Sequence, residues 1–84
     1  MLPLTIRANG SEHVGLLRDI SPSGLFFYSD AKPAVGSRIQ VVINASSADP
    51  DVKVTCVCRV VRVQPHLAGA ATGIAVKIER YQGI

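Results

Sequence analysis

The chain has 84 residues, of which 48% are hydrophobic and 18% are charged, and its formal net charge is +3. This length allows one small domain with a modest core, and the composition excludes a disordered chain. The longest run of bulky apolar residues is Leu25-Phe26-Phe27-Tyr28, too short for a membrane-spanning helix, and no secretory signal is recognisable. We therefore expect a single cytoplasmic domain over residues 1–84, without membrane insertion.

The nine Lys and Arg residues are scattered along the sequence and never form a run. Proteins that bind nucleic acids or anionic membranes usually concentrate their basic residues in a stripe or a block. The charge is therefore compatible with an anionic ligand, but it predicts neither DNA nor RNA binding.

The first half of the chain predicts three strands, over residues 4–8, 13–20 and 24–29. Asn9-Gly10-Ser11 joins the first two as a hairpin turn, because Asn and Gly tolerate a positive φ. Ser21-Pro22-Ser23-Gly24 joins the next two and fits a type I turn, with Ser at position i, Pro at i+1 and Gly at i+3.

Alternation within the third strand separates Leu25 and Phe27 from Phe26 and Tyr28. One of these pairs must face away from the interior. We expect that pair to face outward or to cover one mouth of a barrel.

The second half predicts a loop over residues 30–36 and then three further strands, over residues 37–44, 52–63 and 72–79. Loops over residues 45–51 and 64–71 separate these strands. The fifth strand is apolar at every second residue from Val52 to Val60, and the phase then shifts to Val61 and Val63. Such a shift predicts a β-bulge or a sharp bend.

Six short strands without a helix to cover them must hide their edges by curling. The predicted fold class is all-β, a six-stranded antiparallel β-barrel with little or no helix. An aligned β-sandwich is the second choice.

No catalytic or metal-binding motif is present, so we predict no enzymatic activity, no metal site and no cofactor. Cys56 and Cys58 lie on the same face of a strand, roughly 6–7 Å apart, which is a poor geometry for a disulfide. We interpret them as two small apolar core side chains. His13 and His66, the two histidines, stand in no recognised catalytic arrangement.

The segment Asp19-x-Ser21-x-x-Gly24 is the most informative part of the sequence. By itself it is a plausible turn, because Asp and Ser side chains bond nearby backbone N–H groups. Followed by an apolar strand, it resembles the Asp/Asn-x-Ser-x-x-Gly signature of the PilZ domain family. The later strands, which begin near Gly36, Val54 and Thr72, resemble in order those of the family's six-stranded barrels, so the resemblance covers nearly the whole chain.

The resemblance implies a receptor module for the second messenger cyclic di-GMP. In that family the Asp and Ser of the signature contact a guanine, which assigns Asp19 and Ser21 as polar contacts. Gly24 would let the backbone approach the ligand closely. A carboxylate suits this role because it accepts hydrogen bonds from the N–H edge of guanine.

The family's Arg-x-x-x-Arg segment, which grips the ligand, is missing from this sequence. Arg7 is the only arginine before the first turn, and the positions four residues away hold Pro3 and Ser11. The family's pair would fall upstream of Met1. Arg7 and Arg18 are the candidates for partial compensation, although strand alternation predicts that Arg18 points away from Asp19. We therefore expect weakened or incomplete binding of cyclic di-GMP.

Two alternatives remain at this point. The first is a PilZ-like barrel that binds no nucleotide and serves as an adaptor for a protein partner or an adjoining domain. The second is an oligonucleotide-binding barrel, which the few aromatic residues disfavour because such folds need several stacking platforms.

Overall fold

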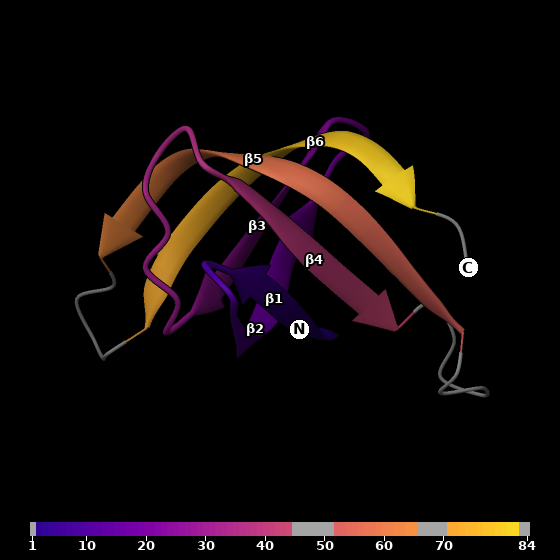
Figure 1. The fold of residues 1–84 in the computed structure, drawn as a ribbon, viewed down its shortest axis with the longest axis horizontal. Helices are drawn as coiled ribbons and strands as arrows, with labels where there is room; N and C mark the ends of the chain where they lie inside the picture. The colour runs from indigo at the N-terminus through magenta and orange to yellow at the C-terminus, as the bar shows by residue number, and fades with distance from the viewer. Residues whose placement is uncertain (1, 45–51, 66–70, 83–84) are drawn as a thin grey trace.

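In a computed structural model, residues 2–44, 52–65 and 71–82 are described, and they form six β-strands and no helix (Figure 1). In chain order the strands are β1 (Leu2–Ala8), β2 (Ser11–Ile20), β3 (Gly24–Ser29), β4 (Arg38–Asn44), β5 (Lys53–Pro65) and β6 (Thr72–Gln82). All neighbouring strands are antiparallel, in the order β1-β2-β3-β6-β5-β4, and the pairing of β1 with β4 closes the barrel. The predicted six-stranded antiparallel barrel is confirmed, and the sandwich alternative is wrong.

Several predicted strand ends are displaced because pairing with neighbours continues beyond the apolar pattern. β1 and β2 begin earlier, and their ladder runs from Ala8↔Ser11 to Leu2↔Leu17. β5 and β6 end later, since their shared ladder runs from Thr55↔Gln82 to Pro65↔Thr72. The loop before β4 is confirmed and extends one residue further, whereas the predicted loop over residues 45–51 and most of that over residues 64–71 lie outside the described residues.

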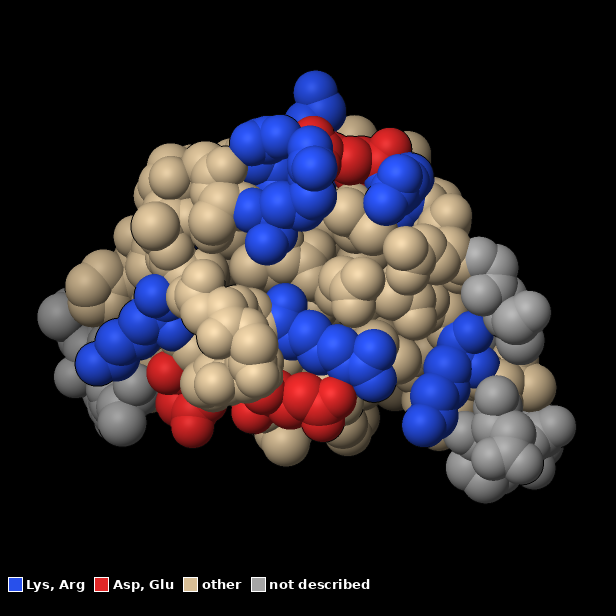
Figure 2. All heavy atoms as spheres, viewed as in Figure 1, with Lys and Arg blue, Asp and Glu red and all other residues tan. Residues whose placement is uncertain are grey.

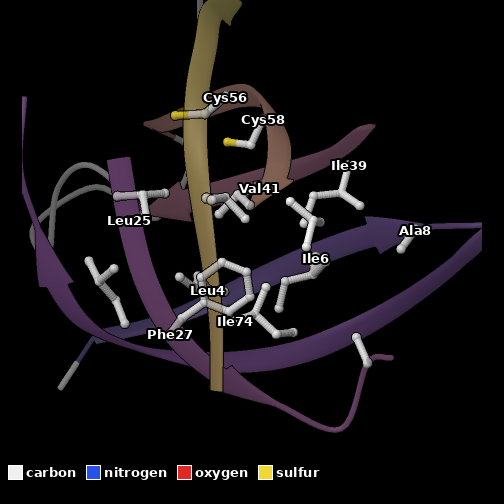
Figure 3. Close-up of a cluster of buried hydrophobic side chains, with 14 residues drawn as sticks. Leu4, Ile6, Ala8, Leu25, Phe27, Ile39, Val41, Cys56, Cys58 and Ile74 are labelled. Atoms are coloured by element: carbon white, nitrogen blue, oxygen red, sulfur yellow. The ribbon is translucent and has the colours of Figure 1, made fainter. Parts of the chain in front are cut away.

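The interior of the barrel collects the alternate side chains of every strand (Figure 3). Phe27 and Leu25 are buried there, so Phe26 and Tyr28 face outward instead of closing a barrel mouth. The core consists of Leu4, Ile6, Ala8, Leu17, Leu25, Phe27, Ala31, Ile39, Val41, Cys56, Cys58, Val60, Ile74 and Val76.

The two cysteines are free and buried, which confirms their interpretation as small core side chains (Figure 3). Burial raises the pKa of Cys58 to about 12 and also raises that of Cys56. Both thiols therefore stay protonated near neutral pH, and a protonated thiol is a poor nucleophile.

Bulges interrupt the ladders at three places. The predicted irregularity in β5 is confirmed, because the pairing with β6 shifts between Val60 and Arg62. A second shift in the same pair lies between Val57 and Cys58. A third, in β2 between Leu17 and Asp19, was not predicted, and it determines the geometry of the site described next.

Candidate functional site

The connection between β2 and β3 is held by the side chain of Ser21. The Ser21 N–H donates to the Gly24 carbonyl at 2.9 Å, and the Gly24 N–H donates to Ser21 Oγ at 3.2 Å. The bond expected in a type I turn, from the Gly24 N–H to the Ser21 carbonyl, is thus replaced by one to the side chain. The backbone pairing with β6 continues into the turn, since the Ser23 carbonyl accepts a hydrogen bond from the Ile78 N–H at 2.9 Å.

Gly24 is required by a close approach between β3 and β6. A Cβ at this position would lie 2.5 Å from the Val76 carbonyl oxygen, a contact that neither backbone can relieve without moving. The φ of Gly24 is not in the positive region, which Gly10 and Gly36 do adopt. Gly24 is therefore required for steric reasons and not for a positive φ at the turn.

The bulge in β2 brings Arg18 and Asp19 to the same side of the barrel. Leu17 pairs with Phe27 and points inward, whereas Asp19 pairs with the outward-facing Phe26, so Arg18 is the extra residue. The expectation that Arg18 points away from Asp19 is wrong, because the bulge suspends the alternation. Arg18 Nε lies 3.8 Å from Asp19 Oδ2, and both side chains are exposed.

Outward-facing aromatic side chains continue the site across β3. The rings of Phe26 and Tyr28 pack edge to face, with centroids 5.4 Å apart. Arg18 donates a hydrogen bond to the Tyr28 hydroxyl, and its guanidinium carbon lies 5.9 Å from the ring centroid. On the far side the guanidinium carbon of Arg62 lies 5.9 Å from the centroid of Phe26. Two arginines thus flank an aromatic pair, an arrangement that cation–π attraction stabilises.

Small residues of β6 make room for the aromatic pair and its two flanking arginines. Ala75 lies between Phe26 and Arg62 in the register, and Gly73 lies opposite Tyr28. The Phe26 ring covers Gly73 so closely that a Cβ there would approach Phe26 Cζ to 2.9 Å. The Phe26 ring can therefore lie over Gly73, because β6 has no side chain at that position.

A hollow of about 250 Å³ opens beside the turn. Asp19, Ser21, Gly24 and Phe26 are among the residues that line it, together with Ile20, Leu25 and Val76. Lys77 stands opposite Gly24 in the register and is exposed. The hollow thus combines a carboxylate, a hydroxyl and an aromatic edge, with cations at its margins.

Arg7 is not brought to this site. Its register partner on β2 is Glu12, seven positions before Asp19, which corresponds to roughly 23 Å along a strand. Arg7 Nε instead makes an exposed ion pair with Glu12 at 2.8 Å. The other four candidate residues, Arg18, Asp19, Ser21 and Gly24, do lie together.

The sequence reasoning did not assign Phe26, Tyr28 or Arg62 to the site. Alternation in β3 separated Phe26 and Tyr28 from Leu25 and Phe27, but it did not say which pair would face outward or what that pair would contact. For Arg62 the phase shift in β5 was visible, whereas its position beside Phe26 depends on the pairing of β3 and β5 with β6.

The structure shows no metal-binding cluster and no membrane-spanning helix where it describes the chain. Across the three described ranges, no group of three or more His, Cys, Asp or Glu residues is placed to hold a metal ion. The same ranges contain no helix of the length and apolarity that crossing a membrane requires.

Comparison with models of protein families finds a match to the PilZ domain over residues 1–83. No curated protein and no solved structure matches the chain at a significant level. The match spans all six strands and includes the segment from Asp19 to Gly24.

Proposed function

The chain belongs to the PilZ domain family, a family of cyclic di-GMP receptors, and on this premise we propose that it binds cyclic di-GMP weakly on its outer face beside the β2–β3 turn. The observation that carries the proposal is the β2 bulge, which presents Asp19 next to Arg18 and Phe26, above a hollow also lined by Ser21 and Gly24. Without the bulge, regular alternation would direct the Asp19 carboxylate into the barrel.

Asp19 is the residue that we expect to select guanine. An ionised carboxylate only accepts hydrogen bonds, and the N1–H and N2–H₂ groups of guanine present two adjacent donors. Adenine offers an acceptor at N1 and therefore fits this group poorly. The proposed role of Asp19 is thus base recognition, with its ion pair to Arg18 keeping the carboxylate in place.

Ser21 and Gly24 act mainly by shaping the turn. The Ser21 hydroxyl already accepts a hydrogen bond from the Gly24 N–H, and its oxygen can accept one further hydrogen bond from a ligand. Gly24 lets β3 and β6 approach, which fixes the floor of the hollow. In this proposal both residues support recognition by Asp19.

Residues around the hollow are proposed to contact the phosphates and bases of cyclic di-GMP. Arg18, Arg62 and Lys77 are exposed cations near it, and guanidinium groups bind phosphate oxygens with paired hydrogen bonds. The Phe26–Tyr28 pair offers an aromatic surface that a base can contact. Because this sequence contains no Arg-x-x-x-Arg, two charge-assisted contacts of the family are missing, and each is worth about 1.5–3 kcal/mol.

Binding is tested by thermal unfolding and calorimetry with cyclic di-GMP, using cyclic di-AMP as a ligand of equal charge. At 100 times the dissociation constant, the ligand should add about 2.7 kcal/mol to the free energy of unfolding. For a domain of this size, each kcal/mol raises Tm by about 4–8 °C. Cyclic di-AMP at the same concentration should raise Tm far less.

The matched variants are Asp19→Asn and Asp30→Asn. Asp30 is also exposed and bonds His13 at 3.1 Å, but it follows the opposite end of β3 from Gly24. We expect Asp19→Asn to weaken cyclic di-GMP binding by about tenfold or more and Asp30→Asn to leave it unchanged, since hydrogen bonds to a charged group are worth about 1.5–3 kcal/mol. Equal effects of the two substitutions would contradict the assignment of Asp19.

The second candidate function is an adaptor barrel that binds no nucleotide. It is favoured by apolar side chains on the outer face of β1 and β2, where Val14 is 73% exposed and Leu16 41% exposed. Val14 also lines a hollow of about 250 Å³ with Pro3 and Val42. Absence of any Tm shift with millimolar cyclic di-GMP would favour this function over the first.

A further inference from the structure

A second polar surface lies on the outer face of β4, β5 and β6, and it borders the Asp19 site at Lys77. Arg38 of β4 stands directly opposite Arg59 of β5, and Arg59 stands opposite Lys77 of β6. Arg80 lies three residues further along β6, opposite Val57. We call these four cations the basic face: Arg38, Arg59, Lys77 and Arg80.

The basic face holds one carboxylate among the described residues, that of Glu79. Glu79 Oε1 accepts from Arg38 Nε at 2.8 Å, and Glu79 Oε2 accepts from Arg59 Nε at 3.2 Å. The hydrogen bond from Arg38 is the largest cause that lowers the pKa of Glu79, and the bond from Arg59 adds to it. Glu79 therefore stays ionised and bridges the two guanidinium groups.

Positive charge still exceeds negative charge on this surface. Four cations surround one carboxylate, an excess equal to the formal net charge of the entire chain, +3. Within the described ranges, Lys77 and Arg80 make no ion pair. Figure 2 shows basic side chains gathered around a small acidic group over the part of the barrel where β5 and β6 run together.

Only part of this arrangement serves the fold. Glu79 bridges Arg38 and Arg59, and Arg59 also donates to the Gly36 carbonyl at 2.8 Å, whereas Lys77 and Arg80 have no such role among the described residues. Like charges directly opposite each other on neighbouring strands destabilise a sheet, and this row opposes Arg to Arg and Arg to Lys. The exposed positions of a barrel tolerate neutral polar side chains equally well. A row of cations at this cost indicates a surface that meets an anionic partner.

The shape and lining of the surface indicate the chemistry of that partner. Arg38, Val57, Glu79 and Arg80 line a hollow of about 210 Å³, which contains no aromatic side chain on which a base could stack. The Glu79 carboxylate already fits between two arginines here, so the spacing suits carboxylate groups. We propose that the basic face docks an acidic segment of a partner protein, whose carboxylates contact Arg38, Arg80 and Lys77.

The proposal is tested with a fluorescein-labelled hexaglutamate peptide and the full chain, by fluorescence anisotropy at low ionic strength. Binding should weaken steeply above about 0.1 M salt, where the Debye length falls to about 10 Å. Arg80→Glu should reduce the affinity about tenfold, and Lys53→Glu should change it less than about twofold. The Lys53→Glu substitution makes the same charge change at an exposed strand position, six residues before Arg59. Equal losses in both variants, or no binding by the unmodified chain, would overturn the proposal.

A second pair of variants separates a defined site from overall charge. Glu79→Gln should raise the affinity for hexaglutamate by roughly three- to tenfold, because it releases the guanidinium groups of Arg38 and Arg59. Glu12→Gln also removes a carboxylate from an exposed ion pair, with Arg7, and should have little effect. Equal gains would show that net charge alone governs binding and would refute the site.

Two further probes test the class of partner. A single-stranded oligothymidylate and vesicles of phosphatidylglycerol carry phosphates in place of carboxylates. If either probe binds more tightly than hexaglutamate, and if the Arg80→Glu variant loses this binding, the assignment of an acidic protein segment is wrong. None of these outcomes depends on cyclic di-GMP, so failure here leaves the Asp19 site unaffected, and the reverse also holds.

Discussion

Two connections between neighbouring antiparallel strands of the barrel reverse the chain direction by different means. Asn9 and Gly10 join β1 to β2 with φ values of 55° and 78°, and a Cβ added to Gly10 would meet no atom within 4 Å. The connection from β2 to β3 uses no positive φ, and it relies on the Ser21 hydroxyl and on the contact of Gly24 with Val76. The first turn is thus determined by its own residues, and the second depends on β6.

The difference explains where function can arise. The Asn9–Gly10 turn needs only two residues that tolerate a positive φ, and beside it lies the exposed Arg7–Glu12 ion pair. The β2–β3 connection is packed against β6 and preceded by the bulge at Arg18, so the backbone positions of its residues are fixed. Binding sites need such fixed positions, since fewer conformations are lost when the ligand binds.

The largest expected effect is that of Gly24→Ala. The new Cβ would meet the Val76 carbonyl, and separating β3 from β6 should cost about 3 kcal/mol of the free energy of unfolding. Urea denaturation measures this as a lower midpoint with an unchanged m value. A loss no larger than that of the Gly10 variant described next would break the comparison, because the β2–β3 connection would then not depend on β6.

Gly10→Ala should have an intermediate effect. Its cost is purely conformational, because a Cβ in the left-handed region is penalised by about 1 kcal/mol while no neighbour is displaced. Gly10→Asn is the matched control and should recover most of the stability, since Asn tolerates this region. Equal losses for Ala and Asn in the same urea measurement would show that something other than φ limits this turn.

Ser21→Ala should give the smallest change, roughly 0.5–1 kcal/mol, because it leaves the Gly24 N–H without its side-chain acceptor at an exposed site. Ser21→Thr retains the hydroxyl and should preserve stability. Ser11→Ala, at the other connection, should leave the free energy of unfolding within about 0.5 kcal/mol of the original. If Ser11→Ala proves as costly as Ser21→Ala, the two connections do not differ in their use of side chains.

The features that depend on local chemistry could be predicted from the amino-acid sequence. Alternation and turn residues predicted six strands, the hairpin at Asn9–Gly10 and the separation of Leu25 and Phe27 from Phe26 and Tyr28, because side chains on a strand have a period of two and Gly permits a positive φ. The phase shift near Val60 predicted the bulge in β5. The signature from Asp19 to Gly24 indicated the family.

Which side chains meet is a consequence of strand pairing in the folded barrel. The bulge at Arg18 has no unambiguous signal in the sequence, since it arises from the register of β2 against β3, yet it places Asp19 on the outer face. The basic face unites Arg38, Arg59 and Lys77, which are scattered along the chain and become neighbours through strand pairing. Pairing between distant segments fixes both surfaces, and no local preference encodes it.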